Sequence, residues 1–215
     1  QLAGAVPVTI PLKAENEFRL TPEELEAAIT PKSKILLLSY PNNPTGAIME
    51  KADLEALCPI IEKYDLLVVS DEIYSELSYK SAHVSIASLP GMRERTIVIN
   101  GFSKAFAMTG WRLGYLACNP AMYQVVLKLF QHSISCTSSF LQKGALTAMD
   151  CVEETEQMRQ AYEKRKNLLV KGIREIPGVE LLTPAGAFYA WVKFDTDMDS
   201  ETLCNDLLDK AKIAG

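Results

Sequence analysis

Three short apolar runs, each ending in polar residues, constrain the fold of this 215-residue chain more than any other feature. They are residues 34–40 (KILLLSY), 65–71 (DLLVVSD) and 96–100 (TIVIN). Continuous apolar runs of this length suit strands that are covered on both faces, as in parallel sheets. Helical patterns at residues 21–29 and 51–64 accompany these runs, so the sequence predicts an α/β fold with a mostly parallel sheet flanked by helices.

The two helical patterns carry their own start and stop signals. Thr21 can cap the first helix, Pro22 fits its first turn, and Glu24 completes a capping box. The second pattern has apolar residues at spacings of three and four from Leu54 onward. Pro59 lies inside this second pattern and, because it has no backbone N–H, should kink or divide the helix.

Beyond residue 100 the sequence predicts a further short strand at residues 115–118 and a helix that Asn119 can cap. A long helical pattern then runs from about Phe140, with side chains of one face three or four residues apart. Pro177 and Gly178 stop it.

The pattern changes after that stop. Residues 179–182 and 186–194 read as two strands, and Ser200 can cap a last helix. We therefore expect residues 1–154 to form part of a large domain. Residues 155–215 are expected to form part of a smaller α+β domain, linked to the first through the long helix.

Composition limits the function classes. The net charge of −5 gives no footprint for nucleic-acid binding, and no stretch is apolar and long enough to span a membrane. The five cysteines are scattered without CxxC spacing, which indicates reduced thiols in a cytoplasmic protein. With two histidines, a metal site is not expected. The first twelve residues lack the basic leader of a signal peptide. The chain begins at Gln1 rather than Met and stops at Gly215 just after a helical pattern, so we expect both ends to be cut from a longer protein.

One lysine stands in unusual surroundings. Lys104 follows the strand at residues 96–100 and is set among apolar and glycine residues, in the segment GFSKAFAMTGWRLG at 101–114. The end of a strand is where open α/β sheets bind ligands. A lysine held among apolar groups loses proton affinity and becomes a usable amine nucleophile. Arg112, eight residues later, offers a planar fork suited to a phosphate.

This segment resembles the lysine motif of the class I/II aminotransferases, which are fold-type I pyridoxal-phosphate (PLP) enzymes of the aspartate/aromatic aminotransferase type. The resemblance rests on the glycine, the small residue before the lysine, the apolar stretch and TGWR-LG. It implies that Lys104 holds PLP as a Schiff base and that Arg112 anchors the cofactor phosphate. Many relatives carry a phosphate-binding serine where this chain has Gly101. This contact is either lost, supplied by a backbone N–H or taken by another side chain, for which Ser103 is a candidate.

Two further strand ends match the same family. Asn43 belongs to an NPTG sequence, which composition alone would assign to a turn. The resemblance implies that Asn43 hydrogen-bonds the phenolic oxygen of PLP. Asp71 would otherwise be read as a helix cap or a solvated charge. The resemblance implies that Asp71 pairs with the pyridine nitrogen, which would keep the ring protonated, and that Tyr74 donates to the phenolic oxygen.

A fourth match is weaker. The segment GAFY at 186–189 resembles a family segment on the substrate side of the small domain, but a packed strand with buried aromatic side chains explains it equally well. Glu72 is expected to be structural, and no role is assigned to His83.

The resemblance implies a transaminase that moves an amino group from an L-amino acid to a 2-oxo acid, acting as a homodimer. The segments of the family that stack on the PLP ring and bind the substrate carboxylate are absent from the sequence, so this piece alone is expected to be inactive. A carbon–sulfur β-lyase and a non-catalytic PLP-fold domain remain alternatives.

Overall fold

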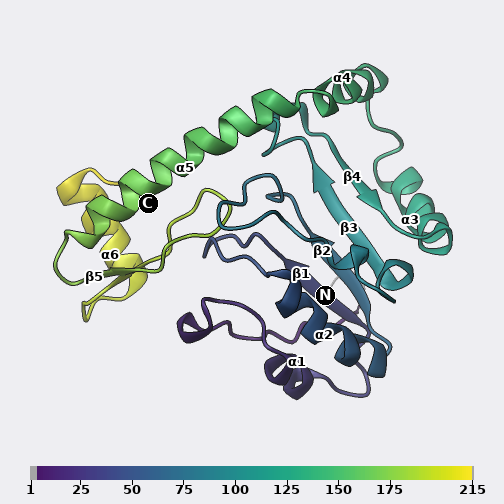
Figure 1. Ribbon diagram of the computed structural model, residues 1–215, viewed down its shortest axis with the longest axis horizontal. Helices are drawn as coiled ribbons and strands as arrows, with labels where there is room; N and C mark the ends of the chain where they lie inside the picture. The colour runs from purple at the N-terminus through teal and green to yellow at the C-terminus, as the bar shows by residue number, and fades with distance from the viewer. Residues whose placement is uncertain (1–3, 215) are drawn as a thin grey trace.

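The computed structural model describes residues 4–214, so Gln1 and Gly215 lie outside the described residues. Its main sheet has four strands in the order β1-β2-β3-β4 (Figure 1). They are β1 (Ile35–Ser39), β2 (Leu67–Asp71), β3 (Thr96–Gly101) and β4 (Gly114–Ala117). The first three are parallel, and β4 runs antiparallel to β3. The mostly parallel α/β sheet expected from the three apolar runs is therefore confirmed.

The register of the sheet brings three strand ends together. Asp71 is opposite Ser39 of β1 and Ile99 of β3. The segments that follow β1, β2 and β3 therefore leave the sheet at one edge, which is where ligands of open parallel sheets bind. At the same edge, Gly101 is opposite Gly114, so β4 returns directly beside the end of β3.

One face of the sheet is covered by α2 (Lys51–Lys63), and α1 (Pro22–Ala28) packs beside it. The capping box of α1 is confirmed, because Thr21 and Glu24 exchange both hydrogen bonds. Pro59 lies inside α2 without dividing it. Of the two outcomes predicted for Pro59, a kink or a division, the division is therefore wrong, and Leu57 and Ile61 on either side of it are fully buried in the core.

The opposite face of the sheet is exposed along β1 and at the start of β2. Along β1 the side chains alternate, with Leu36 and Leu38 buried, whereas Ile35 is 61% and Leu37 70% exposed. Leu67 on β2 is 40% exposed. The expectation that both faces are covered is therefore wrong for residues 4–214. The apolar runs specify strands, but within the described residues this side of β1 stays open to solvent.

The helical region after β4 contains three helices, namely α3 (Pro120–Ser133), α4 (Ser139–Met149) and α5 (Val152–Arg174). Asn119 caps α3 by accepting a hydrogen bond from the backbone N–H of Met122, as predicted. The single long helix expected from Phe140 is instead α4 and α5, separated at Asp150 and Cys151. No glycine or proline marks this break, so the side-chain pattern runs through it.

Helix α5 crosses the molecule from α4 to the C-terminal elements (Figure 1). These are the antiparallel strands β5 (Val179–Leu181) and β6 (Val192–Phe194), α6 (Ser200–Asp206) and a π-helical turn (Leu207–Ala211). The strand predicted over 186–194 is confirmed only for its last three residues. The cap of α6 is Asp199 rather than Ser200, because the Asp199 carboxylate accepts from the Thr202 N–H.

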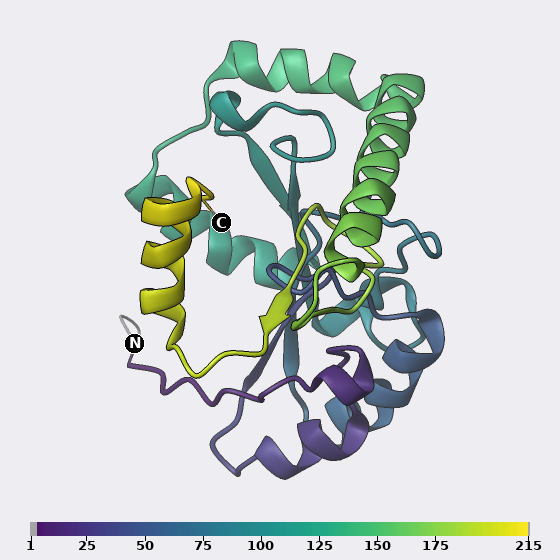
Figure 2. The same cartoon turned by 90° about the vertical axis from the view of Figure 1, so that its left-hand side faces the viewer.

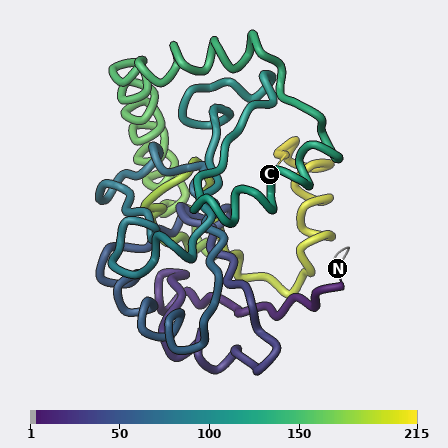
Figure 3. Tube along the Cα trace, turned by 90° about the vertical axis from the view of Figure 1, so that its right-hand side faces the viewer, coloured from purple at the N-terminus to yellow at the C-terminus, as the bar shows by residue number. Residues whose placement is uncertain are grey.

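The N-terminal segment lies beside these C-terminal elements (Figures 2 and 3). Ala14 and Phe18 line a groove with Trp191 and Phe194. The remaining short 3-10 helices are η1 (Ala14–Asn16), η2 (Ile86–Ser88), η3 (Arg93–Arg95) and η4 (Thr109–Trp111). None of the helices within residues 4–214 is long and apolar enough to cross a membrane.

Candidate functional site

The loop after β1 directs Asn43 toward the C-terminal part of the chain. Asn42 stabilises the loop, because its side-chain oxygen accepts a hydrogen bond from the Thr45 hydroxyl at 2.8 Å. Gly46 closes the turn with a φ of +71°, a conformation that favours glycine. The exposed Asn43 amide then donates to the hydroxyl of Tyr189 at 3.2 Å.

Tyr74 meets the same hydroxyl from the other side. The side chain of Tyr74 is 5% exposed and lies in the turn that follows β2. Its hydroxyl oxygen is 2.6 Å from that of Tyr189, and the two rings pack edge to face with centroids 5.6 Å apart. Burial, followed by the hydrogen bond to Tyr189, raises the pKa of Tyr74 above its ordinary value. Tyr74 is thus held as a neutral hydroxyl able to donate a hydrogen bond.

The amine of Lys104 lies beside the aromatic rings that adjoin this group. It lies in the turn after β3 and is half-buried. Its Nζ is 5.6 Å from the centroid of the Tyr74 ring and 5.2 Å from that of Phe188. The structure therefore brings together Asn43, Tyr74 and Lys104, three residues singled out on three different strand ends.

Tyr189 and Phe188 contact the candidate site but were not predicted as site residues from the sequence. The resemblance of GAFY to a family segment was the available signal, but a packed strand explained it equally well. In the structure these residues do not lie in a strand, and Phe188 is 38% exposed. Phe188 stacks on Tyr162 of α5 with centroids 5.5 Å apart.

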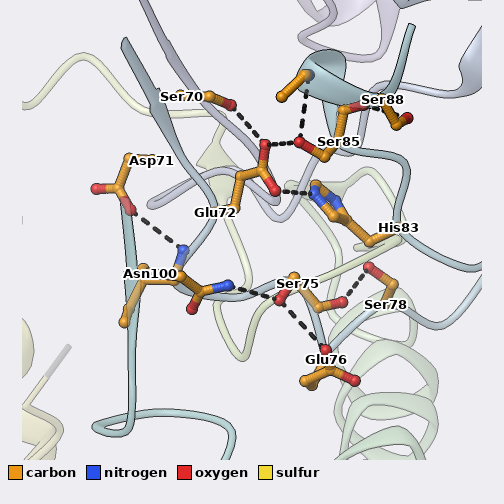
Figure 4. Close-up of polar contacts among 12 residues, drawn as sticks. Ser70, Asp71, Glu72, Ser75, Glu76, Ser78, His83, Ser85, Ser88 and Asn100 are labelled. Atoms are coloured by element: carbon orange, nitrogen blue, oxygen red, sulfur yellow. Dashed lines mark hydrogen bonds and ion pairs between the residues drawn. The ribbon is translucent and has the colours of Figure 1, made fainter. Parts of the chain in front are cut away.

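Asp71, the last residue of β2, is half-buried and accepts a hydrogen bond from the Ile73 N–H at 3.2 Å (Figure 4). This contact stabilises the turn that carries Tyr74. Asn100 supports the same turn from β3, because its amide donates to the Ser75 hydroxyl at 3.1 Å. The turn is therefore hydrogen-bonded to a residue of β2 and to a residue of β3.

Glu72, the residue after Asp71, lies at the centre of a buried polar cluster (Figure 4). Its carboxylate accepts hydrogen bonds from Ser70 at 2.9 Å and from Ser85 at 2.7 Å, and it lies 2.9 Å from Nε2 of His83. Burial alone would raise the pKa of Glu72, but the hydrogen bonds from His83 and Ser85 lower it below its ordinary value. His83, to which no role was assigned, thus has a structural partner.

The geometry explains why position 101 carries glycine. A Cβ atom on Gly101 would lie 3.0 Å from Cα of Gly114 and 3.0 Å from the carbonyl oxygen of Leu113. Its backbone N–H donates to the Asn100 side chain at 2.7 Å, and the next N–H, of Phe102, donates to Leu113. A side chain at position 101 would require these backbone atoms of Leu113 and Gly114 to give way by a few tenths of an ångström. These two backbone donors are also engaged, which leaves the half-buried Ser103 as a candidate.

Arg112 is exposed and stands apart from the hydrogen-bonded group. It follows η4 with a φ of 52°, and its guanidinium donates to the carbonyl oxygen of Thr109 at 3.0 Å. Lys104 and Arg112 lie on the connection between the paired residues Gly101 and Gly114. The connection that carries both residues therefore begins and ends at the same edge of the sheet.

The described residues also form an apolar groove of about 580 Å³ between β4, α3 and α4. Phe102, Leu113, Phe130, Leu146 and Met149 contribute to its lining, and none of its lining residues is charged. It offers no cation for a phosphate and no amine, so the strand ends are the better candidate site. Among residues 4–214, no group of three or more His, Cys, Asp or Glu side chains could hold a metal ion.

The donor set at the strand ends fits PLP. Lys104 supplies an amine beside an aromatic wall, and the Asn43 amide and the Tyr74 hydroxyl, both able to donate, lie within hydrogen-bond distance of one oxygen atom, that of Tyr189. Asp71 supplies a carboxylate at the adjoining strand end, and Arg112 a cation on the lysine connection. An aldehyde, a phenolic oxygen, a ring nitrogen and a phosphate each find a group of matching chemistry.

Comparison with known proteins agrees with this fit. The family described as aminotransferase class I and II matches residues 1–214. An aspartate aminotransferase of Musicola paradisiaca is 45% identical over 193 residues, which cover 89% of this chain and 48% of that protein. Aromatic-amino-acid aminotransferase 2 of Thermococcus litoralis is 42% identical over 217 residues, 99% of this chain and 56% of that protein.

Solved structures give the same result for the fold. An aromatic aminotransferase from Pyrococcus horikoshii superposes with a TM-score of 0.95 at 40% identity, over 99% of this chain and 58% of that one. The chain spans about half the length of the curated relatives that it matches. Its sequence and its fold assign it to one family: the chain belongs to the class I and II aminotransferases.

Proposed function

We propose that the intact protein is a PLP-dependent aminotransferase that moves an amino group from an L-amino acid to a 2-oxo acid. Class I and II aminotransferases are PLP-dependent, and the relatives named above are aminotransferases. The observation that carries the proposal is the convergence of Asn43, Tyr74 and Lys104 from three successive strand ends.

Lys104 is the proposed catalytic residue. Its Nζ would hold the cofactor, and the same amine would carry a proton to and from the substrate carbon. Bound PLP supplies the electron sink for this chemistry. Asp71 holds the proton on the ring nitrogen, because a carboxylate stabilises a neighbouring positive charge.

The other site residues orient the cofactor. Asn43 and Tyr74 donate hydrogen bonds to its phenolic oxygen, and the raised pKa of Tyr74 keeps that hydroxyl protonated. Arg112 binds the phosphate through its guanidinium fork. Ser103 takes over the phosphate contact that a serine at position 101 makes in many relatives, since Gly101, which lies close against the backbone of β4, has no side chain.

The proposal extends to substrates, assembly and compartment. The relatives' names support an amino donor with an acidic or aromatic side chain. All five cysteines are free, which supports a reducing compartment, and we propose the cytoplasm. We further propose that the intact protein is a homodimer and that residues 1–154 and 155–215 belong to its large and small domains.

The decisive experiment is an absorbance spectrum after addition of PLP, recorded for this chain, for the full-length protein and for Lys104→Ala in each. We expect a yellow adduct with Lys104 present and none with Lys104→Ala. A yellow species that survives Lys104→Ala would contradict the assignment.

Amino-group transfer should require the full-length protein, and turnover by the 215-residue chain would refute its proposed inactivity. Pyruvate and ammonia without a 2-oxo acid acceptor would indicate the β-lyase.

A further inference from the structure

One hydroxyl connects the two side chains proposed to bind the phenolic oxygen of the cofactor. The Tyr189 oxygen accepts a hydrogen bond from Asn43 at 3.2 Å and lies 2.6 Å from the Tyr74 oxygen. We propose that Tyr189 is a positioning residue of the cofactor site, which aims both donors and links them to the segment 186–189. This inference rests on the proposed PLP-dependent function.

The segment that carries Tyr189 is fixed to the loop of Asn43. The carbonyl oxygen of Gly46 accepts hydrogen bonds from the backbone N–H groups of Ala185 at 2.9 Å and Gly186 at 2.8 Å. The contact is close-packed, because a Cβ atom on Gly186 would lie 2.7 Å from Cβ of Pro41. The Asn43 loop and the Tyr189 segment therefore move as one unit.

The same segment is fixed to the turn of Tyr74. The Ala187 N–H donates to the carbonyl oxygen of Leu77 at 2.8 Å, and the Tyr79 hydroxyl donates to the carbonyl oxygen of Ala187. Ala187 is fully buried and has a φ of 55°, a conformation that costs a residue with a side chain of the order of 1 kcal/mol. Such a conformation persists only where the surroundings determine it, so these contacts hold the segment in place.

The aromatic rings extend the link to the lysine. Phe188 packs edge to face on Tyr74 with centroids 5.3 Å apart, and its ring lies 5.2 Å from Nζ of Lys104. Segment 186–189 thus contacts residues from all three strand ends. Since Asn43 is exposed, its amide depends on Tyr189 for a fixed orientation. A donor that is already oriented loses less entropy when it binds its acceptor.

The test is Tyr189→Phe in the full-length protein, which removes the hydroxyl and keeps the ring. We expect the Kd for PLP to rise about tenfold, because two hydrogen bonds that orient the donors are lost. Donors to a deprotonated oxygen favour its deprotonated form. The midpoint of the absorbance titration of bound PLP should therefore move to higher pH, by about half a unit or more.

Tyr79→Phe is the matched control. It removes a hydroxyl that donates to the carbonyl oxygen of Ala187 in the same segment and forms no hydrogen bond with the side chain of Asn43 or Tyr74. It should lower the melting temperature without moving the midpoint of the absorbance titration. If Tyr189→Phe changes only the melting temperature, Tyr189 is merely structural and the inference is overturned, while the proposed function stands. If the unaltered full-length protein forms no absorbing adduct with PLP, the proposed function fails and this inference with it.

Discussion

The carboxylate of Glu72 lies 2.9 Å from the imidazole of His83, eleven residues further along the chain. Glu72 stands between Asp71 and the turn of Tyr74, and its backbone N–H donates to the carbonyl oxygen of Ile99 on β3. A buried carboxylate is tolerated only when it is hydrogen-bonded, and this one has partners on both sides of the loop 72–85. The pair therefore holds the two ends of that loop together behind the candidate site.

Glu72→Gln should lower the free energy of unfolding by about 1–3 kcal/mol, the usual cost of weakening hydrogen bonds to a buried charged group. The amide keeps the size of the side chain but replaces one accepting oxygen by a donor. Chemical denaturation followed by circular dichroism measures the change. Glu76→Gln is the control, because Glu76 is exposed and should lose less than about 0.5 kcal/mol. Equal effects of the two substitutions would contradict the structural role of Glu72.

The contribution of Glu72 should also depend on pH. Its pKa is lowered in the folded protein, so the unfolded chain binds the proton more tightly. The stabilisation is then fully present above the unfolded pKa of about 4.3 and is lost as the pH falls through the folded value. The difference in unfolding free energy between the unaltered protein and Glu72→Gln should therefore shrink from pH 5 to pH 3. A difference that grows over this range would show that the pKa is raised instead.

Gly101→Ala should destabilise the protein by about 1–3 kcal/mol, because the added methyl group meets the backbone of Leu113 and Gly114. Backbone atoms cannot rotate away as a side chain can, so β4 must shift from β3. Thermal unfolding of the two proteins checks this. Gly110→Ala, in the same connection, adds a Cβ with nothing within 4 Å and should be tolerated. Were Gly101→Ala equally well tolerated, the close approach of β3 and β4 would not be the reason for glycine.

Much of the fold could be predicted because the signals are local. The apolar runs mark strands, and the caps at Thr21 and Asn119 mark helix starts. Parallel strands bring their carboxyl ends to one edge, so the convergence of Asn43, Tyr74 and Lys104 followed from the motifs and the topology together. The break between α4 and α5 could not be predicted in this way, because Asp150 and Cys151 are compatible with a helix and only the surrounding structure places them outside one.

Tyr189 shows the other limit of sequence reasoning. It is 115 residues from Tyr74 and 146 from Asn43, and it lies outside regular structure. No periodicity or spacing relates positions so far apart. Its place depends on the backbone contacts of residues 185–187 with Gly46 and Leu77, which exist only once the chain is folded. Its role became visible from the hydrogen bonds rather than from the residue types.

The exposed side of the sheet has a consequence for handling the protein. Ile35, Leu37 and Leu67 form an exposed apolar surface, and Ile99 on β3 is 39% exposed. Such surfaces adhere to one another, and excluded salts such as sulfate strengthen that adhesion. Purification of the 215-residue chain should therefore avoid salting-out steps and high concentration. We expect this surface to determine the solubility of the chain, even if the candidate site at the strand ends is correctly formed.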